Sequence, residues 1–345
     1  MPTAPALSPP GGIPLMVGNR LTMLATSARF WRQCNRKVAS SPGSSQYDVE
    51  ISRMLDNLYV ILISMRPKQW LKNGFVFAAL LFSRNIFNPA ATLTSTLAFA
   101  VFCLASGAVY LLNDLVDIEQ DRHHPKKRSR PIASGALNPR RASTAFAVLL
   151  SASLLAGYAI NLRFFLIVMI YLAVQIVYCT FVKEVVILDV FSIASGFFLR
   201  VAAGSVAIEV PMSRWLLICT IFISLFLALA KRRHELLLLG DGAGTHRKVL
   251  DEYNVLFLDQ MVSMATAGTI ISYSLYTLSA ETVARFDTTR LWFTIPIVLY
   301  GVARYLYHVY NKSDGGQPEE IIWRDKSLLA CITLYIIAVV VIIYT

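Results

Sequence analysis

Three aspartates close one of the apolar stretches of this 345-residue chain, at a spacing that could hold a metal ion. Asp114, Asp117 and Asp121 are spaced i, i+3, i+7, which places them on one face of a helix, and Asn113 adds an amide oxygen. Carboxylates gathered in this way repel one another unless a cation lies between them. Oxygen ligands in this number suit Mg²⁺, which keeps several waters and bridges to substrate phosphates. The alternative is a solvated acidic helix end, but ionisable residues at the boundary of an apolar helix are costly and usually functional.

A basic segment, residues 123–135, follows the aspartates directly, and two prolines and a glycine constrain it. Arginine and lysine bind phosphate oxygens through charge-assisted hydrogen bonds, so a fixed basic segment beside a metal site suits a polyphosphate substrate. The alternative is the ordinary enrichment of cytoplasmic loops in basic residues. The candidate phosphate ligands in this part of the chain are Arg122, His124, Lys126, Lys127, Arg128 and Arg130.

Other polar residues stand before, between or inside the apolar stretches and are expected on the same side as the aspartates. The candidates for substrate contacts are Arg66, Lys68, Gln69, Lys72, Asn73, Tyr178, Lys183, Asp189 and Arg200. Trp70 with flanking lysines is also ordinary where a helix enters a membrane, and Asp189 at a helix start is also favoured by the helix dipole. Arg200, deep in an apolar stretch, is expensive unless a partner or a phosphate lies beside it.

The elements that must position these residues are apolar helices. Hydrophobic residues make up 56% of the chain and charged residues only 15%, whereas a soluble domain carries about 25% charged residues. The apolar residues come in blocks of about 20, the length that a helix needs to cross a bilayer, and most blocks lack the polar face of a soluble helix. The sequence predicts an all-α integral membrane bundle of about nine transmembrane helices. They are expected at 73–91, 95–116, 142–160, 163–182, 186–207, 213–231, 261–280, 290–310 and 327–344.

The net charge of +11 indicates topology and anionic ligands rather than nucleic acid, because the basic residues lie in loops between apolar blocks. Segment 121–141 carries seven lysines and arginines and segment 231–258 carries five. The positive-inside rule therefore predicts a multi-pass plasma-membrane protein whose N-terminus and active site face the cytoplasm. Residues 1–57, rich in proline, serine and glycine, are expected to form a disordered cytoplasmic tail before a membrane domain at 58–345.

These residues resemble the UbiA-type membrane transferase superfamily over nearly everything after residue 60. The resemblance rests on the aspartate-rich stretch, on the Arg-Pro-Ile-Ala-Ser-Gly that begins at Arg130, and on Tyr178, Lys183 and Asp189. Segments 66–73, 121–132 and 199–204 are most similar to the decaprenyl-phosphate phosphoribosyltransferase branch. Prenyltransferases of this fold commonly carry a second DxxxD motif. Here the position four residues after Asp189 is Ile193, so the second acid is missing.

The resemblance implies Mg²⁺-dependent transfer of 5-phosphoribose from phosphoribosyl pyrophosphate to a polyprenyl phosphate, a step toward lipid-linked arabinose. Asp114, Asp117, Asp121, Lys127 and Arg130 would carry the reaction. An aromatic prenyltransferase that uses a polyprenyl diphosphate is the first alternative, and the missing acid counts against it. An ion-coupled transporter is the second, although transporters place their charges near the bilayer midplane. Polyprenyl chain length and oligomeric state do not follow from the sequence.

Overall fold

The computed structural model describes residues 46–124, 127–239, 248–312, 316 and 318–345. The chain divides into two compact units, Met1–Val60 and Ile61–Thr345. Most of the expected cytoplasmic tail lies outside the described residues, and the description begins with α2 (Gln46–Ser64). Every regular element in the described residues is a helix, which confirms the predicted all-α fold.

Among the described residues, seven helices are long and apolar enough to cross a membrane. These are α4 (Pro89–Val116), α6 (Pro139–Ile160), α7 (Leu162–Thr180), α8 (Leu188–Ala207), α9 (Arg214–Leu239), α11 (Val255–Leu278) and α15 (Lys326–Tyr344). The shorter elements are η1 (Pro67–Phe77), α3 (Ala78–Leu81), α5 (Ile118–His123), η2 (Lys127–Ser129), η3 (Val182–Glu184), η5 (Lys248–Leu250), α12 (Ala280–Phe286), η6 (Arg290–Thr294), α13 (Ile295–Asn311) and α14 (Pro318–Arg324).

The expected count of nine spans is not reproduced, because two of the nine segments form shorter elements. Segment 73–91 holds the end of η1, the short helix α3 and a turn, and segment 290–310 holds η6 and the 17-residue α13. Asn88 fixes a new helix start inside the first segment, since its side chain accepts the N–H groups of Ala90 and Ala91 and is followed by Pro89. The length of an apolar block predicts a membrane span, but it does not show where a new helix begins within the block.

Asparagine and aspartate set the beginnings of five long helices. In each case the side-chain oxygen accepts a backbone N–H of the first turn, which has no partner within the helix. Such unpaired donors are costly at the edge of an apolar medium, so the caps define where each helix begins. The capping residues of α4, α6, α7, α11 and α15 are Asn88, Asn138, Asn161, Asn254 and Asp325.

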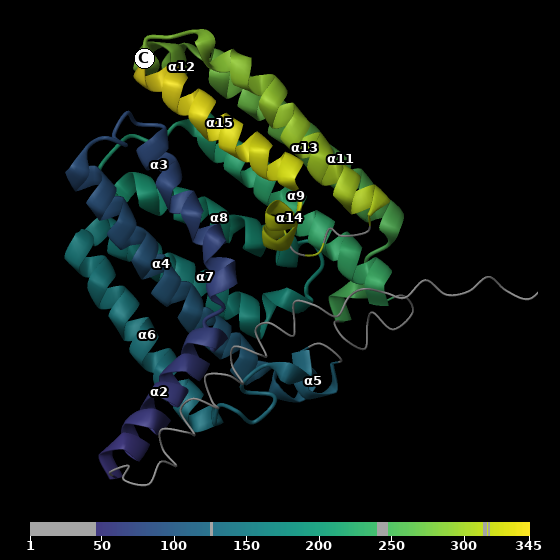
Figure 1. Ribbon diagram of the computed structural model, residues 1–345. Helices are drawn as coiled ribbons and strands as arrows, with labels where there is room; N and C mark the ends of the chain where they lie inside the picture. Colours follow the sequence, from purple (N-terminus) through teal and green to yellow (C-terminus); the bar gives the residue numbers. More distant parts are fainter. Residues whose placement is uncertain (1–45, 125–126, 240–247, 313–315, 317) are drawn as a thin grey trace, which may run out of the picture. The chain divides into compact units, whose positions relative to one another are not determined.

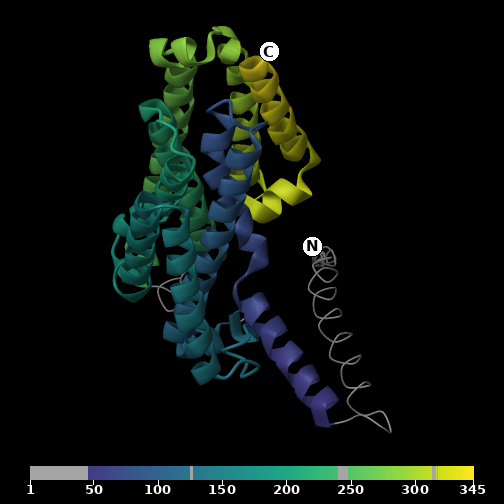
Figure 2. The ribbon, with the colours of Figure 1, turned by 90° about the vertical axis from the view of Figure 1, so that its left-hand side faces the viewer.

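Within the unit Ile61–Thr345, helices that are neighbours in sequence pack side by side from α6 through α11, and η1 lies against both α4 and α8. Gly204 permits the last of these contacts, because a Cβ at this position would collide with the carbonyl oxygen of Val76. In both ribbon views, α12 and the C-terminal end of α15 lie at one end of the unit, and α5 lies toward the other (Figures 1 and 2).

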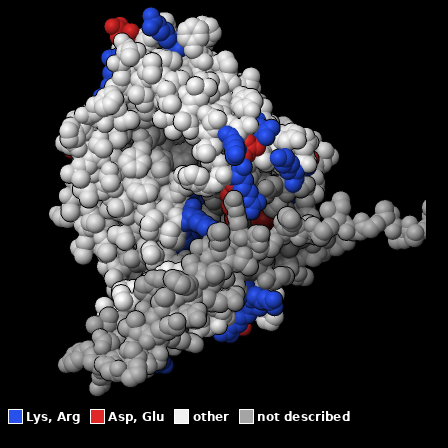
Figure 3. Space-filling view, in the orientation of Figure 1, with Lys and Arg blue, Asp and Glu red and all other residues white. Residues whose placement is uncertain are grey.

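The outer surface has the composition expected against lipid. Leu155 on α6 exposes 72% of its surface, and Leu256 and Leu278, at the two ends of α11, expose 68% and 61%. On the face drawn in Figure 3, lysines and arginines form a few groups separated by surface that carries no charge. Apolar side chains that point outward from capped helices of this length indicate a hydrocarbon environment.

Candidate active site

Asp114, on the last turns of α4, is buried and bound by two arginines from different segments. Its Oδ1 accepts hydrogen bonds from Arg66 Nη2 and from Arg130 Nη1, the latter at 3.1 Å. Arg66 stands in the left-handed backbone region between α2 and η1, and Arg130 follows η2. Two predicted arginines, one before η1 and one in the basic segment 123–135, therefore converge on one predicted carboxylate.

Asp121, on α5, shares Arg130 with Asp114. Arg130 Nη1 donates to Asp121 Oδ2 at 2.6 Å, so a single guanidinium nitrogen lies between the two buried carboxylates. The second oxygen, Asp121 Oδ1, is buried and has no hydrogen-bond partner among the residues that the structure describes. A buried carboxylate oxygen without a donor is costly, which indicates that a cationic ligand can complete this position.

Asp117 closes α4 and binds a lysine that comes from a distant part of the chain. Lys183 Nζ, in η3, lies 2.5 Å from Asp117 Oδ1, and Asn113 Nδ2 donates to Asp117 Oδ2 at 3.1 Å. Both ion-pair side chains are largely buried, with exposed fractions of 14% and 13%. The structure therefore joins the predicted aspartate stretch to the predicted Lys183.

The donor set of this cluster fits a divalent cation that prefers oxygen, although it is arranged around arginine and lysine. In the described residues no group of three His, Cys, Asp or Glu side chains is gathered as a metal site. Asp114, Asp117 and Asp121 are each neutralised by a cationic side chain instead. The unused oxygen of Asp121 and the position of Arg130 between two carboxylates are compatible with Mg²⁺, which binds one or two carboxylates and keeps waters.

The remaining members of the predicted basic segment differ in exposure. Lys127, in η2, is partly buried. Burial lowers the pKa of its ammonium below the ordinary value, and the positive charge of the nearby Arg130 lowers it further. The backbone N–H of Lys127 donates to His124 Nδ1 at 3.3 Å. Arg122 pairs with Glu119 on the surface of α5 at 2.6 Å, and Arg128 and Lys68 are exposed. Lys126 lies outside the described residues.

A cavity of about 230 Å³, with a mainly apolar lining that includes several polar and cationic side chains, lies between η1, α4, α7, α8, α9 and α14. Three predicted residues line it, namely Lys72, Tyr178 and Arg200. In the 3₁₀ helix η1, side chains three residues apart lie on one face, so Gln69, Lys72 and Phe75 stack along it. Gln69 Oε1 accepts from Lys72 Nζ at 2.5 Å, and Phe75 joins Lys72 in the cavity wall.

Arg200 is a buried cation held by neutral groups. Its guanidinium donates to Asn73 Oδ1 at 2.8 Å, to the Gly196 carbonyl at 2.7 Å and to the Tyr171 hydroxyl at 2.9 Å. It also lies over the Tyr171 ring, 4.8 Å from the centroid. Within the described part of the chain Arg200 forms no ion pair, so its positive charge is directed to a cavity that its side chain lines. Such a site attracts an anion.

Tyr110 connects the cavity with the aspartate cluster. Its side chain lines the cavity, and the Arg66 guanidinium lies 4.7 Å from its ring centroid while pairing with Asp114. The two sites are therefore adjacent. A substrate anion in the cavity and a second anion at the cluster can meet near Tyr110.

Asp189 is not part of the aspartate cluster. It is fully buried in the first turn of α8, where Oδ2 accepts from Arg232 Nε at 2.5 Å and Oδ1 accepts from the Tyr253 hydroxyl at 2.8 Å. Arg232 also pairs with Glu235 and donates to the Tyr178 hydroxyl at 3.3 Å. Asp189 reaches the cavity only indirectly, through Arg232 and Tyr178.

Sequence reasoning missed several cavity residues, and for some of them a signal was present. Tyr171 and Gln175, which were missed, lie seven and three residues before the predicted Tyr178 on α7, so three polar-ended side chains share one face of an otherwise apolar helix. That pattern could have been found. Pro318 and Ile322 of α14 also line the cavity, and nothing in their local sequence indicates it.

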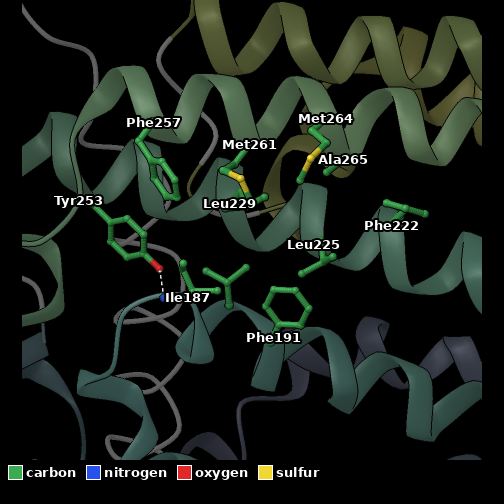
Figure 4. Close-up of a pocket in the computed structure, with 11 residues that line it drawn as sticks. Ile187, Phe191, Phe222, Leu225, Leu229, Tyr253, Phe257, Met261, Met264 and Ala265 are labelled. Atoms are coloured by element: carbon green, nitrogen blue, oxygen red, sulfur yellow. Dashed lines mark hydrogen bonds between the residues drawn. The ribbon is translucent and has the colours of Figure 1, made fainter.

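A second hollow lies between α8, α9 and α11 and is almost wholly apolar (Figure 4). Phe191, Leu225 and Met261 are among its lining side chains, and Tyr253 closes one end of it. No charged residue lines it within the described residues. It therefore lacks the chemistry of the cavity around Arg200.

Comparison with known proteins assigns the family. The model of the UbiA prenyltransferase family matches residues 74–332. The chain is 34% identical to decaprenyl-phosphate phosphoribosyltransferase of Mycolicibacterium smegmatis over 78% of this chain and 87% of the relative. It is 36% identical to the protein of that name in Corynebacterium glutamicum, over 81% and 86%.

Among solved structures, a UbiA homolog from Archaeoglobus fulgidus bound to GPP and Mg²⁺ has the same fold. Its TM-score is 0.64 at 19% sequence identity, and the match covers 81% of this chain and 99% of that one. The helical arrangement, the apolar spans and the family match agree that this is a multi-pass membrane protein. The chain belongs to the UbiA prenyltransferase family.

Proposed function

We propose that this protein transfers 5-phosphoribose from phosphoribosyl pyrophosphate to a polyprenyl phosphate and releases pyrophosphate. The observation that carries the proposal is the pairing of two adjacent sites. One is a cavity with the buried Arg200, which forms no ion pair with any described residue. The other is an aspartate cluster with Arg130 between two carboxylates. The names of the relatives at 34% and 36% identity support this reaction.

The donor is assigned to the aspartate cluster. Asp114, Asp117 and Asp121, with Asn113, would hold Mg²⁺, which neutralises the charge of the leaving diphosphate when it is bound. Arg130 and Arg66 would then exchange a carboxylate partner for a phosphate oxygen, which both guanidiniums bind well. Lys127 supplies a further cation beside Arg130.

The acceptor phosphate is assigned to the cavity, which is lined by Lys72 of η1, Arg200 of α8 and Lys231 of α9. A phosphate monoester is anionic near neutral pH, so its oxygen can attack the anomeric carbon without a general base. As the bond to pyrophosphate breaks, that carbon gains oxocarbenium character, and the new bond forms to the lipid phosphate. Phe75, Ile193 and Phe197 give the cavity an apolar side for the start of the prenyl chain.

We place the reaction at the cytoplasmic face of the plasma membrane, from the lysines and arginines of segments 121–141 and 231–258. Aromatic prenyl transfer on the same fold is the alternative. It is disfavoured because Ile193 occupies the place of a second acid and because Asp189 is fully engaged by Arg232 and Tyr253.

The test is an assay of the purified full chain with Mg²⁺, labelled phosphoribosyl pyrophosphate and polyprenyl phosphate, in which label is followed into the organic phase. We expect lipid-soluble label that disappears with EDTA. Absence of transfer, together with activity on a prenyl diphosphate and a hydroxybenzoate, would move the protein to the aromatic prenyltransferase branch. Absence of any transfer, together with ion-dependent transport in vesicles, would favour the transporter.

A further inference from the structure

The connection that enters α8 contains a backbone conformation that is rare for its residue type. Ile187 has φ 69° and ψ −46°, and the Leu188 N–H donates to the Val186 carbonyl at 2.7 Å. This is a γ-turn with a β-branched residue at its centre, an arrangement that is strained because the Cβ is crowded at positive φ. A turn of this kind persists only where the surrounding structure holds it.

Tyr253, which lies between η5 and α11, contacts the turn through its hydroxyl. Its hydroxyl accepts the Ile187 N–H at 2.7 Å (Figure 4). The same hydroxyl donates to Asp189 Oδ1 at 2.8 Å. Burial raises the pKa of the Tyr253 hydroxyl above its ordinary value, so the proton that Asp189 accepts stays in place. Asp189 is bound in turn by Arg232, which fixes the start of α8 to the end of α9.

The segment that carries Tyr253 is itself anchored. In η5, Val249 and Leu250 are fully buried, and Tyr253 is buried and stacked on Phe257, with ring centroids 6.1 Å apart. The position of the Tyr253 hydroxyl is therefore fixed by packing. Its hydrogen bond with the Ile187 N–H fixes the position of the turn in the same way.

The turn lies four residues after Lys183, whose ammonium pairs with Asp117. The intervening backbone is tied to α8, because the Asp189 N–H donates to the Val185 carbonyl at 3.1 Å. Without the turn, the chain would enter α8 from another direction. η3 would then be displaced, and Lys183 would no longer reach Asp117. The hydroxyl of Tyr253 thus acts on the aspartate cluster through the backbone of residues 183–187.

We propose that Tyr253 is a positioning residue of this transferase, which holds the Ile187 turn and thereby keeps Lys183 on Asp117. The role in turnover rests on the proposed function, whereas the mechanical link between Tyr253 and Lys183 does not. The two parts can therefore be tested separately on the purified full chain.

The first measurement is acetylation of lysines by an N-hydroxysuccinimidyl ester without substrate, quantified by mass spectrometry against the exposed Lys326. In the unmodified chain Lys183 should react slowly, since it is 14% exposed and paired. Tyr253→Phe keeps the ring but removes the hydroxyl, and we expect the acetylation of Lys183 to rise several-fold. Tyr158→Phe removes an exposed hydroxyl on α6 and should change nothing.

The second measurement is rescue. We expect Tyr253→Phe alone to lower kcat about tenfold. Glycine adopts positive φ without strain, so Ile187→Gly added to Tyr253→Phe should restore the protection of Lys183 and most of the kcat. A general loss of stability would instead deepen on adding glycine. Unchanged protection of Lys183 in Tyr253→Phe, or no rescue by glycine, would overturn the proposal. Normal rescue of protection in a chain that transfers no phosphoribose would keep the link and reject the proposed function.

Discussion

Asp114 and Asp189 are both buried carboxylates bound by arginine, but the arginines differ in their access to solvent. Arg66 and Arg130, the partners of Asp114, are 27% and 22% exposed. Arg232, the partner of Asp189, is fully buried, and Tyr253 occupies the other oxygen. The first pair can exchange partners with a ligand, whereas opening the second leaves an uncompensated charge inside the protein. The two sites contain the same residue types, but only the arginines at Asp114 are accessible enough to exchange partners with a ligand. The Asp189 site instead stabilises the fold.

The largest effect is expected at Asp114. Asp114→Asn keeps the shape of the side chain but removes the charge that the proposed Mg²⁺ and both arginines share, so kcat should fall on the order of 1000-fold. The assay is phosphoribosyl transfer, and thermal unfolding should show a folded chain. Glu119→Gln, a matched change on exposed α5, should retain activity. Full activity of Asp114→Asn would remove the distinction between the two sites.

The converse is expected at Arg232, where stability should fall. Arg232→Met leaves the buried Asp189 without its cation, which costs about 3–5 kcal/mol of unfolding free energy. Unfolding in detergent measures the loss. Arg122→Met breaks a surface pair with Glu119 at the same i, i+3 spacing and should cost less than about 1 kcal/mol. Equal losses in both variants would contradict the structural role of the buried pair.

A smaller effect on binding is expected at Arg200. Arg200→Lys keeps the charge, but an ammonium cannot bond Asn73, Gly196 and Tyr171 in the planar arrangement of a guanidinium. We expect KM for polyprenyl phosphate to rise about tenfold, with kcat less affected. Arg163→Lys, on an exposed part of α7, is the control. A change confined to the donor KM would reassign the cavity to the donor.

The smallest effect is a shift in pH dependence at Lys127. Burial and Arg130 lower the pKa of Lys127, so its charge is lost as pH rises through a value below that of an exposed lysine. Turnover that needs this cation should therefore decline on the alkaline side. Lys127→Arg keeps the charge, because guanidinium does not deprotonate in this range, and should move that decline to higher pH. An unchanged pH profile, alongside an unchanged Lys326→Arg control, would exclude Lys127 from the site.

The contrast between Asp114 and Asp189 also explains what could be predicted from the sequence. Apolar block length located seven long helices, because spanning hydrocarbon imposes one length and one backbone geometry. It failed at residues 73–91, where a cap at Asn88 and the 3₁₀ helix η1 divide an apolar block. Apolar composition carries no information on which type of helix forms.

For the site residues, what could be predicted depended on how far apart the interacting residues lie in the sequence. The aspartates lie close together in sequence, so helical spacing placed Asp114 on one face with its neighbours. Asp189 is expected from the sequence on the same side as the aspartates, as a substrate contact. Its partners Arg232 and Tyr253 are 43 and 64 residues away and approach only through tertiary packing. No local sequence pattern distinguishes an aspartate that binds a ligand from one that forms an ion pair with a buried arginine.

The cavity wall made by α14 sets an order of events during synthesis. The aspartate cluster is encoded before residue 131, whereas Pro318 and Ile322, which complete the cavity, come almost 190 residues later. At the usual rates of translation, roughly ten to forty seconds separate the two. A nascent chain in the membrane therefore contains the aspartates well before α14 is available to complete the cavity wall.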